Sequence, residues 1–173
     1  KTVALKYFPV YTGGKWGVID SRGNTIINPE YEEYIVIPDN TRPIFICTYD
    51  VDYEKGTYKT KVINEKNEEI YTEYNNVEAL ENYDENNNLW YEDGIFKVEQ
   101  DGKYGVIDTN GKLLVSPEYD SIEALQGVEK VLLTEKNGKL GIIDNVGTVI
   151  IDNNYKKIES ISSKYGDGFI VEA

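Results

Sequence analysis

The sequence contains no histidine and no methionine, and Cys47 is its single cysteine. Without histidine, the Ser-His and Cys-His dyads of nucleophilic catalysis and every histidine-containing zinc site are excluded from these residues. Cys47 lies in the apolar run 44–47, which favours a buried, small apolar side chain over a reactive thiol. One cysteine also excludes an internal disulfide framework. The composition therefore rules out much of common hydrolase chemistry.

Long apolar runs and basic residues are also scarce. No segment approaches the roughly 18 apolar residues that span a bilayer, and none resembles a signal peptide. The 18 basic and 31 acidic side chains give a net charge of -13, which repels nucleic acid and anionic membranes and favours cationic partners. We therefore expect neither nucleic-acid binding nor membrane insertion. Because the chain begins at Lys1, we also expect it to be a fragment of a longer or processed protein.

What the sequence does contain is a repeated segment. Residues 17–23 (GVIDSRG), 105–111 (GVIDTNG) and 141–147 (GIIDNVG) align without gaps, and a tyrosine follows eight residues after the second glycine of each. The shared positions are, in the first copy, Trp16, Gly17, Asp20, Gly23 and Tyr31; in the second, Tyr104, Gly105, Asp108, Gly111 and Tyr119; and in the third, Gly141, Asp144, Gly147 and Tyr155, with Leu140 at the aromatic position.

A fourth, degenerate copy lies between the first two. Residues 62–67 follow the same frame, with Asn64 at the aspartate position and Asn67 at the second glycine position, while Lys61 stands at the first glycine position. Asparagine is the residue other than glycine that best tolerates a positive φ angle, so the backbone geometry is kept. The predicted units are approximately 1–41, 42–92, 93–127 and 128–165, with the start of a fifth at 166–173.

Each unit has the pattern of short antiparallel strands joined by tight turns. A first strand such as 95–98 runs into Asp101-Gly102, a dipeptide that favours a type I′ hairpin. The second strand carries the repeated box, and we expect its aspartate to accept backbone N–H groups in an Asx-type turn rather than to act as an acid. The third strand is apolar without alternation, and the segment after the tyrosine is either an edge strand or a helical turn.

These patterns predict an all-β fold. Its repeats would be three- to four-stranded antiparallel units of about 36–44 residues. No single unit of this size covers both faces of its sheet, so neighbours must stack. The stack is predicted to be an open array, with propeller-like blades as the alternative.

The glycine beside Trp16 calls for a packing explanation. In a strand, Gly17 points to the face opposite Trp16, and a residue without a side chain lets another segment approach closely. We expect that segment to belong to a neighbouring unit, so that Gly105→Val would disrupt stacking between units. The change from Trp16 to Tyr104 and Leu140 predicts that the aromatic position fills core volume rather than recognising a ligand.

The repeated box resembles that of the WG-repeat family, bacterial β-rich repeats with a Gly-Lys-Trp-Gly-aliphatic-Ile-Asp box, a later glycine and a Pro-x-Tyr-Asp segment. Residues 14–20 with Gly23, and 102–108 with Gly111 and Pro117, carry this pattern. The third clear copy lacks the aromatic residue and the proline. The resemblance implies an interaction array with no recognised catalytic residue and no cofactor, often on bacterial surface or secreted proteins and also in cytoplasmic ones.

The resemblance leaves two binding functions open. We expect a non-catalytic interaction or scaffold module of a larger bacterial protein that binds a protein partner, with binding of cell-wall carbohydrate as the alternative. Aromatic cell-wall-binding repeats have longer aromatic runs than this sequence has. An enzyme of the glycosidase type needs two carboxylates at a set separation in a cleft, and the abundance of acidic residues is no evidence for such a pair.

Any binding surface is expected in the second unit, because insertions in repeats form loops on one face. Two segments, 49–56 and 81–91, depart from the pattern. The alternative for their aromatic residues is packing onto the array. The predicted binding residues are Tyr49, Tyr53, Trp90 and Tyr91.

The loop 50–56 also resembles a calcium-binding loop. Asp50, Asp52 and Glu54 offer carboxylates at alternate positions, as hard cations require. However, Gly56 comes one place late and Lys61 stands at the last ligand position. We therefore expect an acidic, solvated loop and no metal site.

Overall fold

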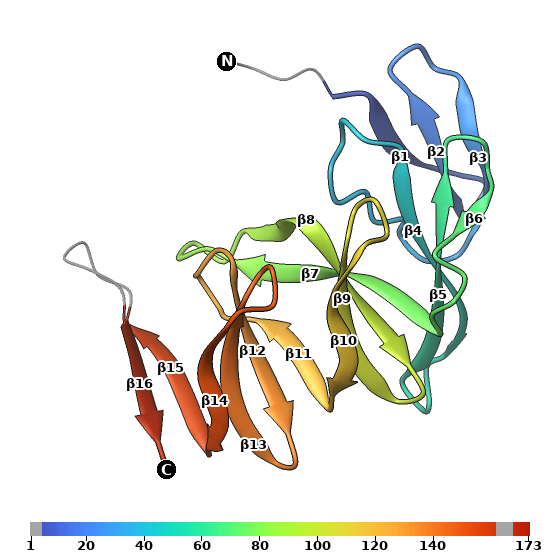
Figure 1. The fold of residues 1–173 in the computed structure, drawn as a ribbon. Coiled ribbons are helices and arrows are strands. Elements are labelled where there is room, and N and C mark those ends of the chain that lie inside the picture. Colours follow the sequence, from blue (N-terminus) through green and yellow to red (C-terminus); the bar gives the residue numbers. More distant parts are fainter. Residues whose placement is uncertain (1–4, 162–167) are drawn as a thin grey trace. The chain divides into compact units, whose positions relative to one another are not determined.

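The computed structural model describes residues 5–161 and 168–173. These residues form strands and turns and no helix, which confirms the predicted all-β fold (Figure 1). The strands are β1 (Tyr7–Thr12), β2 (Lys15–Asp20), β3 (Thr25–Tyr31), β4 (Ile44–Asp52), β5 (Thr57–Asn64), β6 (Glu69–Ile70), β7 (Asn76–Tyr83), β8 (Leu89–Gln100), β9 (Lys103–Asp108), β10 (Leu113–Tyr119), β11 (Ser121–Ala124), β12 (Val131–Lys136), β13 (Lys139–Asp144), β14 (Val149–Tyr155), β15 (Lys157–Ile161) and β16 (Gly168–Glu172).

The strands of the described residues form small antiparallel sheets of two to four strands, none closed into a barrel. Neighbouring strands in each sheet follow one another in the chain and pair antiparallel, as in a β-meander. The sheets are β1-β2-β3, β4-β5-β6, β7-β8-β9-β10, β11-β12-β13-β14 and β15-β16.

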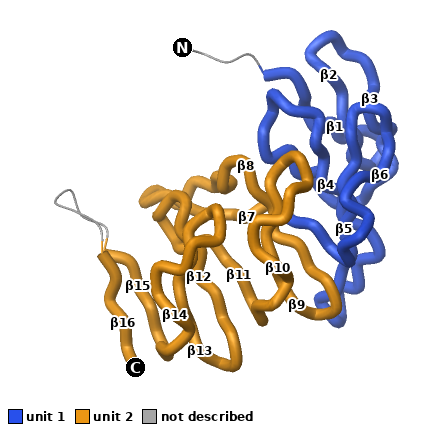
Figure 2. Tube along the Cα trace, viewed as in Figure 1, with its two compact units in different colours: residues 1–78 blue, residues 79–173 orange. Residues whose placement is uncertain are grey.

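The chain divides into two compact units, which are not the repeat units predicted above. From here on, the first unit is residues 1–78 and the second unit is residues 79–173 (Figure 2). Inside each unit, apolar side chains of successive sheets pack together and are removed from water, which stabilises the stack. The core of the first unit contains Val18, Ile27, Ile35, Ile37, Phe45, Cys47 and Ile63. The cores of the second unit contain Leu80, Ile95, Val106, Val115, Tyr119, Ile122, Leu132 and Ile143, and then Leu125, Ile142 and Ile158.

After Tyr31 the chain forms an isolated bridge between Val36 and Ile46 and no named strand before β4, but in the other two clear copies the segment after the box tyrosine is a strand, β11 or β15. It does not pair with the strand before it. Instead β11 pairs with β12 and β15 pairs with β16. Each four-stranded sheet therefore combines the last strand of one sequence copy with three strands of the next. The unit boundaries given above stay a prediction.

The aspartate that ends the box strand organises the turn after it. Asp20 Oδ1 accepts the backbone N–H groups of Arg22 at 2.9 Å and Asn24 at 2.8 Å. Gly23 in that turn has a φ angle of +83°, which a residue without Cβ adopts freely. The turns after Asp108 and Asp144 have the same pair of side-chain acceptor bonds.

Two further turns share this geometry without a glycine. Asn64 accepts two backbone N–H groups in the degenerate copy, and Asn67 has a φ angle of +59°. Asp84 likewise accepts the N–H groups of residues 86 and 88, and Asn87 has a φ angle of +62°. The segment 81–91 is thus an ordered insertion, because it lengthens the hairpin of β7 (8 residues) and β8 (12 residues) relative to β11 (4 residues) and β12 (6 residues).

The box glycine faces a bulge in the third strand of its own sheet. Trp16 pairs with Tyr31 and Val18 pairs with Ile27, so Gly17 alone lies opposite a longer stretch of β3. The register shifts in the same way opposite the glycines of β9 and β13. Extra residues on one strand are the defining feature of a β-bulge.

The bulge leaves no room for a side chain at the glycine. A Cβ atom on Gly17 would lie 2.5 Å from the Ile27 carbonyl oxygen and 2.8 Å from the Pro29 nitrogen, and Gly105 and Gly141 face the same obstruction. The close approach expected at this position is therefore present, but the expectation that a neighbouring unit makes it was wrong. The approaching backbone is the next strand of the same sheet, which pattern alone did not reveal.

A buried polar pair holds the connection between β11 and β12 in the second unit. Asn82 Nδ2 donates to the Leu125 carbonyl oxygen at 3.0 Å, and its Oδ1 accepts the Gly127 N–H at 2.8 Å. Glu92 Oε2 accepts the Lys130 N–H at 3.1 Å. The other oxygen of Glu92 has no hydrogen-bond partner among the described residues. Burial raises the pKa of this carboxyl group above its ordinary value.

Candidate functional site

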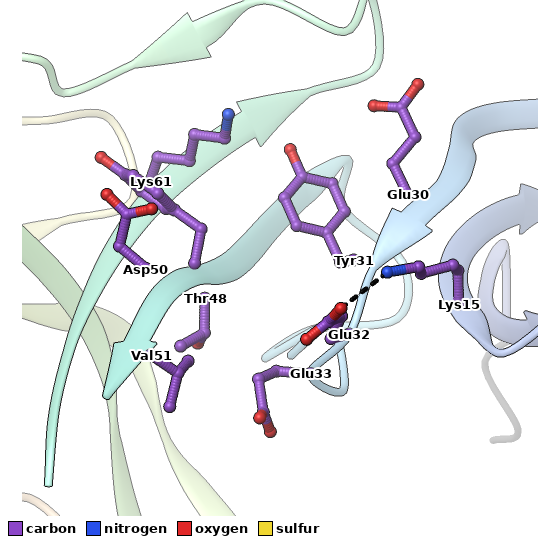
Figure 3. Close-up of a pocket in the computed structure, with 10 residues that line it drawn as sticks. Lys15, Glu30, Tyr31, Glu32, Glu33, Thr48, Asp50, Val51 and Lys61 are labelled. Atoms are coloured by element: carbon purple, nitrogen blue, oxygen red, sulfur yellow. Dashed lines mark hydrogen bonds and ion pairs between the residues drawn. The ribbon is translucent and has the colours of Figure 1, made fainter. Parts of the chain in front are cut away.

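A pocket of about 340 Å³ opens in the first unit between the chain after β3 and the strands β4 and β5 (Figure 3). Its volume is in the range of sites that bind small groups. The lining mixes tyrosine rings with charges of both signs. The residues around it are Lys15, Glu30, Tyr31, Glu32, Glu33, Thr48, Tyr49, Asp50, Val51 and Lys61.

The pocket forms where the degenerate copy has lost its glycine. Lys61 occupies the position that a glycine holds in β2, β9 and β13. In those sheets the bulged third strand crosses over the glycine, but β6 pairs only with Val62 and Ile63 and does not reach Lys61. The Lys61 side chain therefore projects into space that a backbone strand fills in the other sheets.

The Lys61 ammonium group lies over two aromatic rings. Its Nζ atom is 5.5 Å from the centre of the Tyr31 ring and 5.2 Å from that of Tyr49, which are distances typical of cation–π contacts. Burial alone would lower the pKa of Lys61, but the Tyr31 hydroxyl and the charge of Glu69 outweigh burial, and the pKa is raised. Lys61 therefore stays a cation at neutral pH.

The tyrosine and the cysteine beside Lys61 are unreactive. Burial raises the pKa of the Tyr31 hydroxyl above its ordinary value. Burial also raises the pKa of the Cys47 thiol to about 12. Cys47 is completely buried and stays protonated, so it is no nucleophile. Tyr31 lines the pocket, whereas Cys47 belongs to the core beside it.

Three acidic residues of the pocket, Glu32, Glu33 and Asp50, pair with a lysine or a tyrosine. Lys15 Nζ donates to Glu32 at 2.8 Å, and this hydrogen bond lowers the pKa of the Glu32 carboxyl group (Figure 3). Lys59 lies 3.8 Å from Asp50. The Tyr53 hydroxyl donates to Glu33. The pocket wall thus contains local pairs between side chains of the two charge signs and between a tyrosine and a carboxylate.

Two of the predicted binding residues lie at this pocket. Tyr49 lines it, and Tyr53 at the tip of the β4–β5 hairpin is 75% exposed and bonded to Glu33. Trp90 and Tyr91 lie in β8 and are half-buried. A role for all four in binding stays a prediction.

The proposed calcium-like loop uses its oxygens locally. Asp52 Oδ1 accepts the N–H groups of Glu54 at 3.0 Å and Lys55 at 3.1 Å, and Asp50 pairs with Lys59. Within residues 5–161 and 168–173, no group of three or more acidic or cysteine side chains is placed to hold a metal ion. The loop is an acidic turn at the pocket rim.

Sequence reasoning missed a second aromatic surface, here called the aromatic cluster: Tyr11, Trp16 and Tyr34. The Trp16 ring centre lies 5.0 Å from that of Tyr11 and 4.9 Å from that of Tyr34. Tyr11 is 60% exposed and Tyr34 is 51% exposed, while Trp16 also contacts the core. The sequence did contain a signal for the aromatic cluster, because Tyr34, three residues after the box tyrosine, stands where the other copies have a valine or an isoleucine.

The sheets and their repeated turns define this chain as a β-repeat protein. Residues 16–37 and 104–139 match the family model described as WG containing repeat. These two stretches are thus similar to WG repeats, which confirms the resemblance seen in the sequence there. No curated protein and no solved structure was found to be similar. In the part of the chain that the structure describes, no helix is long and apolar enough to cross a membrane.

Proposed function

We propose that the chain is a non-catalytic interaction module that binds a protein partner at the pocket of its first unit. One observation carries the proposal: a pocket opens at Lys61, where the repeat has lost its glycine and its full third strand. Tyrosine rings lie inside the pocket and at its rim. Tyrosine supplies apolar contact area together with a polar hydroxyl, and for this reason it is enriched at protein interfaces.

The charges of the pocket also suit a protein surface. The lining has two lysines and four carboxylates, a formal charge of -2, arranged partly in pairs such as Lys15–Glu32. A partner that carries both apolar and charged side chains can exchange these pairs for pairs across the interface, which gives specificity. The net charge of -13 favours the approach of a basic partner.

The test compares proteins captured by wild-type chain and by two variants. Tyr53→Ala removes an exposed ring at the pocket rim, and Tyr83→Ala removes an exposed ring of the second unit as the matched control. We expect a partner that binds wild type and the Tyr83 variant, and binds the Tyr53 variant at least tenfold more weakly in titration calorimetry. Equal retention by all three proteins would contradict the use of this pocket.

The aromatic cluster supports a second candidate, carbohydrate binding. Exposed rings such as Tyr11 and Tyr34 beside Trp16 offer stacking faces of the kind that anchor sugar ligands. In a Trp90→Phe protein the tryptophan fluorescence, excited selectively over that of tyrosine, reports on Trp16 alone. If soluble cell-wall glycans change this emission, and Tyr34→Ala removes the change, carbohydrate binding is supported. Unchanged emission across a glycan panel counts against it.

A further inference from the structure

Two turns of the second unit carry an asparagine that is followed by a glycine. They are Asn110-Gly111, in the turn after β9, and Asn137-Gly138, in the hairpin between β12 and β13. In such a dipeptide the glycine backbone nitrogen can attack the side-chain carbonyl carbon of the asparagine, because glycine has no Cβ atom to hinder the approach. The nitrogen attacks after it has lost its proton, so a hydrogen bond that its N–H donates slows the reaction.

The two turns differ at this attacking nitrogen. The Gly111 N–H donates to the Asp108 carbonyl oxygen at 3.0 Å. The Gly138 N–H lies in a two-residue turn between the paired residues Lys136 and Lys139, and it has no hydrogen-bond acceptor among the described residues. In other respects the turns match, because both asparagines are exposed and the backbone N–H of each donates to an aspartate side chain. The fold therefore engages one nitrogen and leaves the other free.

We propose that Asn137 is a site of spontaneous deamidation in the folded protein, that the fold protects Asn110, and that the isoaspartate product at 137 destabilises the second unit. The deprotonated Gly138 nitrogen forms a bond to Cγ of Asn137, and the bond from Cγ to the side-chain nitrogen breaks as that nitrogen takes up a proton and leaves as ammonia. Water then adds to either carbonyl group of the cyclic imide, and the ring opens to aspartate or isoaspartate. The net reaction consumes one water molecule and releases one ammonia molecule.

The aspartate product fits this turn, because the chain already contains the same turn with aspartate. The β8–β9 hairpin has Asp101-Gly102 between its paired residues, with φ angles of +52° and +81°. Asn137 and Gly138 have φ angles of +53° and +77°. Aspartate at 137 therefore keeps the backbone of the hairpin and adds one negative charge to a chain whose net charge is -13.

The isoaspartate product does not fit, because its main chain runs through the former side chain and gains one atom. The two strands pair directly beside the turn, Lys136 with Lys139, and in the same register Leu132 pairs with Ile143. Both of these apolar side chains are buried in the core of the second unit. A longer turn disturbs the register that places them there. Isoaspartate should therefore weaken the sheet that aspartate leaves intact.

The test incubates the full chain at mildly alkaline pH and follows both sites by mass spectrometry. A glutamate-specific protease places them in separate peptides, residues 100–118 and 136–159. In the folded chain we expect Asn137 to react at least about fivefold faster than Asn110, which is roughly the factor that one hydrogen bond gives. In urea, where neither turn is formed, the two rates should be similar. Equal rates in the folded chain, or the same ratio of rates in urea, would overturn the proposal.

Variants locate the reaction and separate its two products. Asn137→Gln, whose longer side chain closes a ring slowly, should remove most of the ammonia release, and the matched control Asn110→Gln should leave it unchanged. Asn137→Asp should melt at the wild-type temperature, whereas the isoaspartate fraction of aged wild type, isolated by ion-exchange chromatography, should melt lower. Equal ammonia release by the two glutamine variants would contradict the site. An isoaspartate fraction that melts with the Asn137→Asp protein would overturn the claim that this product destabilises the unit.

Discussion

At the scale of single residues, the aspartate at the end of each box strand acts as a hydrogen-bond acceptor. Five turns share one geometry, and Asn64 supplies the same acceptor bonds as Asp20 does. The carboxylate charge is therefore not what the turn requires. This role was predictable from sequence, because all the atoms involved lie within five consecutive residues.

The first prediction follows from this chemistry. Asp108→Ala removes the acceptor for the N–H groups of residues 110 and 112 and should lower the free energy of unfolding by about 1–2 kcal/mol. Asp108→Asn keeps an acceptor, as the degenerate copy does, and should stay close to wild type. Urea denaturation of the three proteins measures these free energies. Equal losses of unfolding free energy in both variants would show that the carboxylate charge matters.

The second prediction concerns the buried Glu92. Burial raises its pKa above the ordinary value of 4.5, with Glu129 and Asp93 acting in the same direction. The unfolded chain then loses this proton at a lower pH than the folded chain does. The contribution of Glu92 to stability is thus present below the unfolded pKa and is lost as pH rises through the folded pKa.

Glu92→Gln tests this account because its side chain stays neutral and keeps an acceptor for Lys130. The free energy of unfolding of the variant minus that of the wild type should increase as the pH rises from about 4 to about 7. Urea melts at a series of pH values measure it. Parallel pH profiles for the two proteins would show that Glu92 does not titrate differently on folding.

At the scale of elements, the bulged third strand recurs in the three sheets that keep the box glycine. Its position could not be predicted from sequence, because it depends on the register between two strands rather than on either strand alone. The same limit hid the pocket, which exists because β6 is short and leaves Lys61 uncovered. The β7–β8 hairpin was missed for another reason: Asn87 takes the positive φ angle that glycine takes elsewhere.

The third prediction tests the bulge. Gly105→Ala places a methyl group against the Val115 carbonyl oxygen of β10 and should cost about 3 kcal/mol in free energy of unfolding. Gly102→Ala is the control, since its φ angle is +81° but nothing lies within 4 Å of a Cβ atom there. It should cost about 1 kcal/mol through backbone strain. Similar losses at both glycines would exclude steric conflict as the cause.

At the scale of the whole molecule, the main feature is the excess of acidic over basic side chains. Because the net charge is -13, the acidic side chains of the folded protein repel one another at neutral pH. Because the sequence has no histidine, no side chain has an ordinary pKa between 6 and 7. This property could be read from composition alone. The division into two compact units could not, because it depends on which sheets share apolar side chains.

The fourth prediction is a salt dependence of stability. Added sodium chloride should raise the melting temperature by screening self-repulsion, with most of the rise complete by roughly 0.3 M salt, where the screening length is shorter than the spacing of most surface charges. Differential scanning calorimetry measures it. A melting temperature that is flat up to that concentration would show that the acidic residues are already compensated by local pairs such as Lys15–Glu32.

The sharing of strands between sequence copies has a consequence for how such a chain can grow. A sheet such as β11-β12-β13-β14 begins with the last strand of one copy and ends with the third strand of the next. Duplication of one full period of the gene, wherever the breakpoints fall, therefore inserts one complete sheet and leaves every other sheet whole. Repeat number can change by unequal recombination without a requirement for breakpoints between sheets, and each new copy is then free to lose its glycine and open a pocket of its own.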